Sequence, residues 1–442
     1  KKYSDFVQYP IELKVTRTEI ERDEEGKPVE GAEEKTTTEW VTVNSMKAIW
    51  AKSPEEVTEE EYNEFYKHVA HDWEDPFETI AFKAEGTFDY QVLLYVPGRA
   101  PFDLFYRDQN YGLQLYVNRV LIKENADELV PAWLRFLKGV VDSPDLSLNV
   151  SREILQNDRR VAAIRARITR KVTQALAKIM KDDRARYVEF WEKYGVVLKE
   201  GMTDQESADS VRSLLLLNSS NGEELTTLSE YVERMKEGQE HIYYLTGASR
   251  EAVESSPHLE AFVAQGYEVL YLTDPIDEIM VGHVTEFEGK ELQSAGKGTV
   301  EFGTEDERKE AEEARKAEEE THASLLELLQ ETLEDHVKEV RLSSRLRTSA
   351  ACLVGDTNDL SPGLERLLRQ SGQEAPSQKR ILELNPEHDI MTRLKDMYAA
   401  DGSDQKIVDF AHLLHGQALI SEGSQLPDPA GFARRVADLM TH

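Results

Sequence analysis

The alternation of apolar and polar residues divides the chain into stretches typical of strands and stretches typical of helices. Near the N-terminus, the two kinds of residue alternate over Phe6 to Val15 and again over Trp40 to Val43. This indicates two strands, because neighbouring side chains of a strand point to opposite faces. A charged segment, Glu19 to Glu34, lies between them. The pattern therefore predicts a hairpin with a long exposed tip.

Further along, the spacing of apolar residues changes repeatedly between the two periods. Helical spacing is found over residues 59–70, 127–141, 249–265 and 325–337. A longer helix is predicted to start at Asn149, with apolar positions every four residues at Ile164, Ile168, Val172, Leu176 and Met180. Strands are predicted over residues 89–96, 113–122, 241–246, 268–272, 339–342, 351–354 and 380–384. Strands that alternate with helices predict an α/β fold with partly parallel strands.

The last third of the chain has a different character. Residues 305–320 hold nine acidic and four basic residues and no large apolar one, so they predict a solvated helix or linker. Two amphipathic helices follow Asp404, and they can pack inward or pair with a second copy as a four-helix bundle. Their apolar positions are Ile407, Phe410, Ala411, Leu414, Ala418, Phe432, Val436 and Leu439.

Composition excludes several classes of protein. The 442 residues suffice for two or three domains. With 53 basic against 85 acidic residues, the net charge of −32 repels nucleic acid and anionic membranes, so neither is expected as a partner. A single cysteine, Cys352, excludes an internal disulfide framework and fits a reducing cytoplasm. There is no apolar run of 18 residues to span a membrane.

The sequence contains few motifs that indicate a catalytic or ligand-binding site. The sequence holds no phosphate-binding loop, no dinucleotide fingerprint and no nucleophile elbow. His68 and His71 are three residues apart without a third clear ligand, so no metal site is predicted.

One polar face remains, at the start of the long helix. Asn149, Arg152 and Gln156 fall on the same side of its first turns. A cation in the first turn opposes the helix dipole, so Arg152 needs an anion nearby. A neighbouring carboxylate and a phosphate both fit, and arginine binds phosphate bidentately. Six more basic residues follow, and acidic neighbours or an anionic partner could neutralise them: Arg159, Arg160, Arg165, Arg167, Arg170 and Lys171.

The segment from Asp142 to Gln156 closely resembles the signature of the 90-kDa heat-shock protein chaperones, in particular their bacterial branch. Other segments look like parts of the same family and run in family order over residues 61–71, 100–104, 112–117, 231–239 and 381–386. The resemblance covers essentially the whole chain. Nothing in it resembles the family's N-terminal ATP-binding domain, and the first six residues look like the opening of the middle domain.

The resemblance implies a fold of mixed α/β and α+β class. A middle domain is expected over residues 1–303, with α/β subdomains at 1–150 and 236–303 joined by a helical connector at 151–235. A smaller α+β dimerisation domain is expected over residues 304–442, with the charged segment 305–320 leading into it. The final helices would join two chains as a homodimer.

The resemblance also assigns roles to the polar face. Arg152 would reach the γ-phosphate of ATP when the N-terminal domain docks, with Gln156 as its helper and Asn149 supporting the loop. ATP and Mg²⁺ would act in the full-length protein, whereas this chain alone is expected to bind neither and to be inactive. The predicted function is that of a cytoplasmic, ATP-dependent chaperone that binds and remodels partly folded client proteins.

Client contacts are expected at two patches. One is Glu278, Ile279 and Gly282, where bacterial members usually have an aromatic in place of Ile279 and a polar amide in place of Gly282. The other comprises Leu360, Leu367 and Leu368; a helix that faces the core explains these leucines equally well. Two alternatives for the function are a DNA-acting ATPase of the same superfamily, which the net charge argues against, and a non-catalytic scaffold in which Arg152 forms only an internal ion pair.

Overall fold

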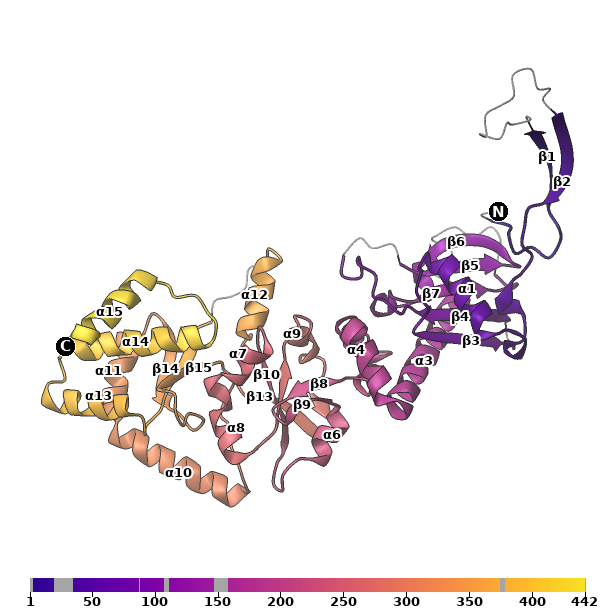
Figure 1. Ribbon diagram of the computed structural model, residues 1–442. Helices are drawn as coiled ribbons and strands as arrows, with labels where there is room; N and C mark the ends of the chain where they lie inside the picture. The colour runs from indigo at the N-terminus through magenta and orange to yellow at the C-terminus, as the bar shows by residue number, and fades with distance from the viewer. Residues whose placement is uncertain are drawn as a thin grey trace. The chain divides into compact units, whose positions relative to one another are not determined.

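The computed structural model describes residues 3–19, 35–86, 88–106, 111–146, 158–373 and 378–441. The chain forms two compact units, Lys1–Leu198 and Lys199–His442 (Figure 1). Both combine helices with sheets, which confirms the predicted α/β and α+β fold class. The subdomain boundaries inferred from the family resemblance stay a prediction.

The first unit is built on a five-stranded sheet with the strand order β3-β4-β7-β5-β6. β5 and β7 are parallel, and the other neighbours are antiparallel. The strands are β3 (Glu78–Ala84), β4 (Tyr90–Val96), β5 (Leu113–Val117), β6 (Val120–Ala126) and β7 (Lys138–Asp142). A separate antiparallel ribbon of β1 (Glu12–Glu19) and β2 (Lys35–Thr42) confirms the predicted hairpin; the residues between the two strands lie outside the described part.

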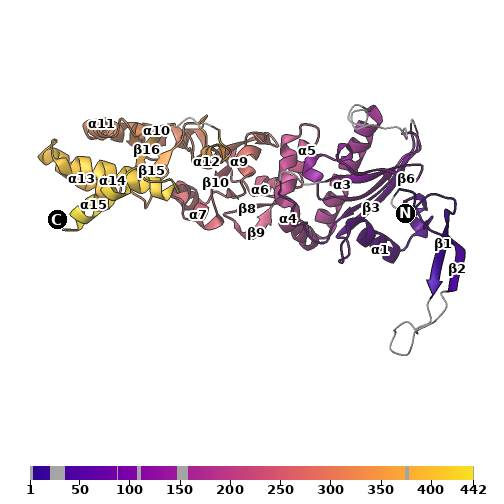
Figure 2. The same ribbon diagram turned by 90° about the horizontal axis from the view of Figure 1, so that it is seen from above.

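Two helices, α1 (Glu59–Ala70) and α3 (Arg159–Asp182), pack against this sheet (Figure 2). α4 (Arg184–Lys199) follows α3. Phe65 and Tyr66 of α1 pack with Leu93 and Tyr95 of β4 in one core. The apolar positions of α3 that recur every four residues, from Ile164 to Leu176, are buried, which confirms the predicted helix from Arg159 onward. The prediction that this helix runs without a break from Asn149 was wrong, because Asp158 is an N-cap with extended backbone.

Two predicted elements of the first unit were wrong. The predicted strand 113–122 is a tight hairpin, because Asn118 and Arg119 both have positive φ, of 51° and 64°, as the mirror-image turns of two-residue hairpins require. The predicted helix 127–141 consists of two short 3₁₀ turns followed by β7. The close pairing of β7 with β4 requires glycine at position 139, since a Cβ atom there would lie 2.1 Å from the carbonyl oxygen of Leu93.

The second unit begins with a six-stranded sheet of order β12-β13-β10-β11-β8-β9. Its centre is parallel, because β10 pairs in parallel with both β11 and β13. The strands are β8 (Leu217–Ser219), β9 (Gly222–Thr226), β10 (His241–Thr246), β11 (Val269–Leu272), β12 (Glu286–Phe287) and β13 (Lys290–Ser294). The flanking helices are α5 (Ala208–Arg212), α6 (Leu228–Glu233), α7 (Arg250–Glu254), α8 (Glu260–Gln265) and α9 (Asp277–Met280). The predicted helix 249–265 is interrupted at Pro257, which starts a 3₁₀ turn.

The rest of this unit is a smaller α+β layer around a three-stranded sheet, β14-β16-β15. The strands are β14 (Val337–Leu342), β15 (Ala351–Val354) and β16 (Arg380–Leu384). The helices are α10 (Glu305–Thr321), α11 (Ala323–Thr332), α12 (Pro362–Gln370), α13 (Asp389–Ala400), α14 (Gln405–Ser421) and α15 (Pro429–Thr441). α10 has no buried residue, as its charge predicts. α11 ends earlier than predicted, because Val337 already belongs to β14.

Candidate functional site

Asn149, Arg152 and Gln156 lie in the segment 147–157, outside the described residues, so their roles stay predictions. What the structure shows is how the two ends of this segment are held. The incoming end follows β7, and the outgoing end begins α3.

The incoming end is fixed by buried hydrogen bonds. Asp142, the last residue of β7, accepts a bond from Trp50 Nε1 at 3.0 Å and another from the backbone N–H of Arg119 at 3.2 Å. The buried Ser143 donates from Oγ to the carbonyl oxygen of Asp89 at 2.7 Å. Because buried polar groups are costly to leave unpaired, these bonds fix the direction in which the chain leaves the sheet.

The outgoing end carries its own helix cap. Asp158 Oδ1 accepts from the backbone N–H of Arg160 at 2.8 Å, and Asp158 Oδ2 lies 2.7 Å from Arg160 Nη2. The hydrogen bonds from the Arg160 guanidinium hold the pKa of Asp158 below its ordinary value. The same guanidinium donates to the carbonyl oxygen of Asp145 on the incoming side. This hydrogen bond therefore links the residues that come before and after the predicted catalytic segment.

The first helix after this segment keeps an exposed basic character. Among the described residues, only Arg160 of the six predicted basic side chains forms an ion pair. Arg167 Nε is buried and has no hydrogen-bond partner within the described ranges, and Lys171 Nζ lies 6.0 Å from the ring centre of Phe82. The other five of these basic residues therefore form no ion pair with an acidic residue in the described part, which favours the interpretation that this face meets an anionic partner.

The two predicted client-binding patches lie side by side. Glu278 and Ile279 are on α9, and Gly282 follows it; Leu367 and Leu368 are on α12, and Leu360 precedes it. Ser361, the N-cap of α12, donates from Oγ to Glu278 Oε2. The two helices are in contact. One continuous surface therefore contains both patches.

Only part of this surface is open to solvent. Ile279 is 44 % exposed, and Gly282 is exposed as well. Leu360, Leu367 and Leu368 are half-buried, so both interpretations of α12 remain open. The structure tests neither patch for client binding.

The predicted dimer interface needs a correction in α14. Five of its predicted residues are buried in the core of their own chain, because α14 packs against β15 and α11; they are Ile407, Phe410, Ala411, Leu414 and Ala418. In α15, Phe432 lies against Gly416 of α14, and Leu439 packs partly on the same core. Val436 and Met440 remain exposed, Met440 by 82 %. An interface on these helices therefore has to use their outward side.

Three histidines meet beside this core. The ring of His336 lies 5.3 Å from that of His415 and 6.0 Å from that of His412. Burial, with the neighbouring histidines, lowers the pKa of His415 to about 4. Burial also lowers the pKa of His412, and Arg435 adds to this effect. No group of three or more possible ligands among the described residues is arranged to hold a metal ion.

The neutral His415 predicts a loss of stability in acid. Because the unfolded chain protonates this imidazole below pH 6.5 and the folded chain only near pH 4, stability falls as the pH drops between these values. We expect His415→Gln to reduce the acid-dependent loss between pH 7 and pH 5 by about 1 kcal/mol, allowing for partial exposure. Urea unfolding at both pH values measures this loss. An equal loss in both proteins would contradict the expectation.

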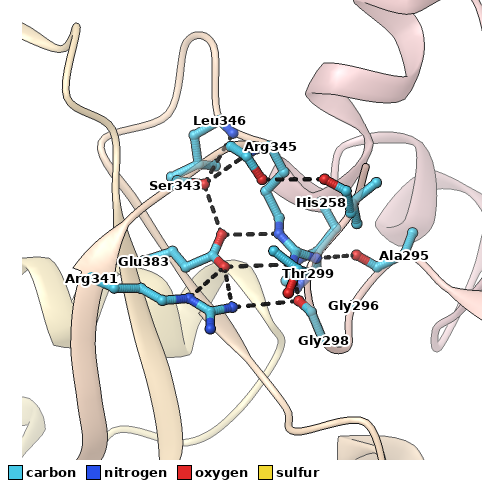
Figure 3. Close-up of polar contacts among 12 residues, drawn as sticks. His258, Ala295, Gly296, Gly298, Thr299, Arg341, Ser343, Arg345, Leu346 and Glu383 are labelled. Atoms are coloured by element: carbon cyan, nitrogen blue, oxygen red, sulfur yellow. Dashed lines mark hydrogen bonds and ion pairs between the residues drawn. The ribbon is translucent and has the colours of Figure 1, made fainter. Parts of the chain in front are cut away.

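A buried charge network in the second unit was not predicted from the sequence (Figure 3). Arg345 is fully buried, and its Nε lies 2.9 Å from Glu383 Oε2. Arg341 Nη2 lies 2.7 Å from Oε1, and Ser343 Oγ donates to Oε2 at 2.7 Å. Burial alone would raise the pKa of Glu383, but the two guanidinium charges outweigh it and lower this pKa.

The network joins the two sheets of the unit. Arg345 donates from its Nη atoms to the carbonyl oxygens of Ala295 and Gly298, which follow β13. Glu383 belongs to β16. The only sequence signal was a carboxylate in the middle of an otherwise apolar strand.

The architecture defines a protein of two units, in which a mixed sheet with packed helices precedes a second mixed sheet and a helical α+β layer. The family model "Hsp90 protein" matches residues 15–442. The chain therefore belongs to the Hsp90 family, whose members are molecular chaperones.

Similar proteins are of the bacterial HtpG type. The chain is 52 % identical over 442 residues to the "Chaperone protein HtpG" of Mycobacterium tuberculosis (strain ATCC 25177 / H37Ra), covering 99 % of this chain and 68 % of that protein. It is 51 % identical over 450 residues to the protein of the same name from Nocardia farcinica, covering 100 % of this chain and 68 % of the relative. No helix in the described ranges is long and apolar enough to cross a membrane.

Proposed function

We propose that this chain acts in an ATP-dependent chaperone, where it supplies the catalytic arginine, a client-binding surface and a dimer interface in the cytoplasm. The observation that best supports client binding is the hydrogen bond from Ser361 Oγ to Glu278 Oε2, which links the two predicted client-binding patches. Family members that bind partly folded proteins need apolar surface beside polar groups, and α9 with α12 offers both.

Catalysis is proposed to use Arg152 on an ATP molecule held by a nucleotide-binding domain. The described residues fit this role in two respects. Arg160 donates a hydrogen bond to the carbonyl oxygen of Asp145, so the described residues on either side of the segment that contains Arg152 are held together. Arg159, Arg165, Arg167, Arg170 and Lys171 form no ion pair with another described residue, and their positive charge favours an anionic ligand nearby. Arg152 would stabilise the negative charge that develops on the transferred phosphoryl group, with Gln156 and Asn149 supporting it.

Client binding is tested by replacing Ile279 with aspartate. We expect the chain to slow the aggregation of a heat-unfolded enzyme, and Ile279→Asp to weaken its binding of that client about 5- to 30-fold, because a charge replaces a half-exposed apolar contact. Val263→Asp is the matched control, since Val263 is 67 % exposed on α8, outside both patches. If both variants bound the client as the parent does, this patch would not be the client site.

Dimerisation is tested on α15. We expect the chain to have twice the mass of one chain in solution, and the double variant Val436→Glu, Met440→Glu to be monomeric, because charge on the outward side opposes burial between two copies. Ultracentrifugation measures the mass, and Val263→Glu serves as the control. A double variant that stayed dimeric would place the interface elsewhere.

A further inference from the structure

The second unit contains a cleft of about 720 Å³ at the carboxyl ends of its parallel strands. The segments that follow β10, β11 and β13 all line it, through Gly247, Asp274 and Gly296 among others. These strands are parallel, so their carboxyl ends meet at the same edge, where open α/β sheets bind ligands. α12 and the end of α14 form the opposite wall. The volume suits one small molecule.

Two cations of the cleft have no ion-pair partner among the residues that the structure describes. Lys297 lies on the sheet side and Arg366 on α12, and neither forms an ion pair or side-chain hydrogen bond with a described residue. Lys297 is half-buried. Burial lowers its pKa, and the charges of Glu278 and Asp359 offset only part of this effect. A desolvated ammonium of this kind is stabilised when an anion binds to it.

The acidic side chains of the cleft are already engaged. Glu278 accepts from Ser361, and Asp274 lies 2.7 Å from Lys199 Nζ. Glu422 forms an ion pair with Arg380. Glu278 keeps its negative charge, since a serine hydroxyl does not neutralise it, but Lys297 and Arg366 leave the lining with an excess of positive charge.

The cleft also offers apolar surface and one unused polar atom. Leu245, Val253 and Leu272 form buried apolar parts of its wall, and Ile420, 52 % exposed, lies on it too. His258 lines the cleft and is more than nine-tenths buried. Its Nδ1 has no hydrogen-bond partner in the described part of the chain. Burial lowers the pKa of His258 to about 3, so the neutral ring has one donor and one acceptor nitrogen.

We propose that this cleft binds a small amphipathic anion, with its carboxylate or phosphate group between Lys297 and Arg366 and its apolar body against the leucine-lined wall. Two unpaired cations select the anion, and the apolar wall selects a molecule larger than an inorganic ion. The cleft shares Glu278 and Leu367 with the proposed client-binding patches. Lys297 and Arg366 belong to neither patch, so variants of these two residues test the anion site separately from client binding.

Isothermal titration of the full chain with decanoate, decyl phosphate, decanol and inorganic phosphate tests this. We expect at least one of the two amphipathic anions to bind at least about 10-fold more tightly than decanol and than inorganic phosphate, because a charge-assisted hydrogen bond contributes about 1.5–3 kcal/mol. Whether decanoate or decyl phosphate binds more tightly identifies the head group. Equal affinity for decanol and both anions, or no binding of either anion, would overturn the proposal.

Lys297→Gln is expected to weaken that binding about 10-fold. Arg366→Gln is the second variant, since Arg366 is exposed and its loss leaves the fold intact if Lys297→Gln does not fold. Arg369→Gln is the matched control, because Arg369 lies on the same helix but does not line the cleft. Unchanged affinity in the Arg366 variant, or an equal loss in the control, would contradict the site.

Discussion

Replacement of Arg345 by methionine is expected to lower the free energy of unfolding of the second unit by about 3–5 kcal/mol, because it leaves the buried Glu383 without its main charge partner. The variant also loses two hydrogen bonds to the carbonyl oxygens of Ala295 and Gly298. Urea unfolding followed by circular dichroism measures the change.

Two controls separate the buried network from a general effect of removing an arginine. Arg347→Met should change stability by less than about 0.5 kcal/mol, since Arg347 is exposed and only two residues away. The double variant Arg345→Met, Glu383→Leu should recover much of the loss, because no uncompensated charge then stays buried. A double variant no more stable than Arg345→Met would show that the carbonyl contacts, and not the charge pair, hold the two sheets together.

Arg152→Ala is expected to reduce ATP hydrolysis at least about 100-fold when the chain is joined to the N-terminal nucleotide-binding domain of a family member. The reason is that an arginine that meets the transferred phosphoryl group stabilises charge mainly in the transition state. The affinity for ATP should change much less. Steady-state turnover and equilibrium nucleotide binding together measure this difference.

The sequence predicted elements best where one period of burial runs without interruption. α1 and the described part of α3 are examples, because each presents one apolar face to a sheet. Prediction failed where elements other than an α-helix produced the same spacing of apolar residues. Leu134 and Val140 are buried as a helix would bury them, yet they belong to a 3₁₀ turn and to β7. The pairing of β7 with β4 and β5 distinguishes the strand from a helix, and the spacing of apolar residues does not reveal this pairing.

Contacts between residues that are far apart in the sequence could not be predicted from it. Arg345 and Glu383 are 38 positions apart, and their pairing depends on how β14 and β16 align. The residues of α14 raise the same difficulty, since Phe410 and Leu414 suit a dimer interface and an internal core equally well until β15 is placed beside them. The polar face around Arg152 stays a prediction, because Asn149, Arg152 and Gln156 lie outside the described residues.

The most direct measurement of the central claim is the rate of a single ATP turnover in the joined protein, with Arg152→Ala and Arg165→Ala compared under saturating nucleotide. Arg165 is exposed on α3 and serves as the matched loss of one nearby cation. The proposed function predicts a rate at least about 100-fold slower for Arg152→Ala and a nearly unchanged rate for Arg165→Ala. Equal rates in the parent and in Arg152→Ala would contradict it.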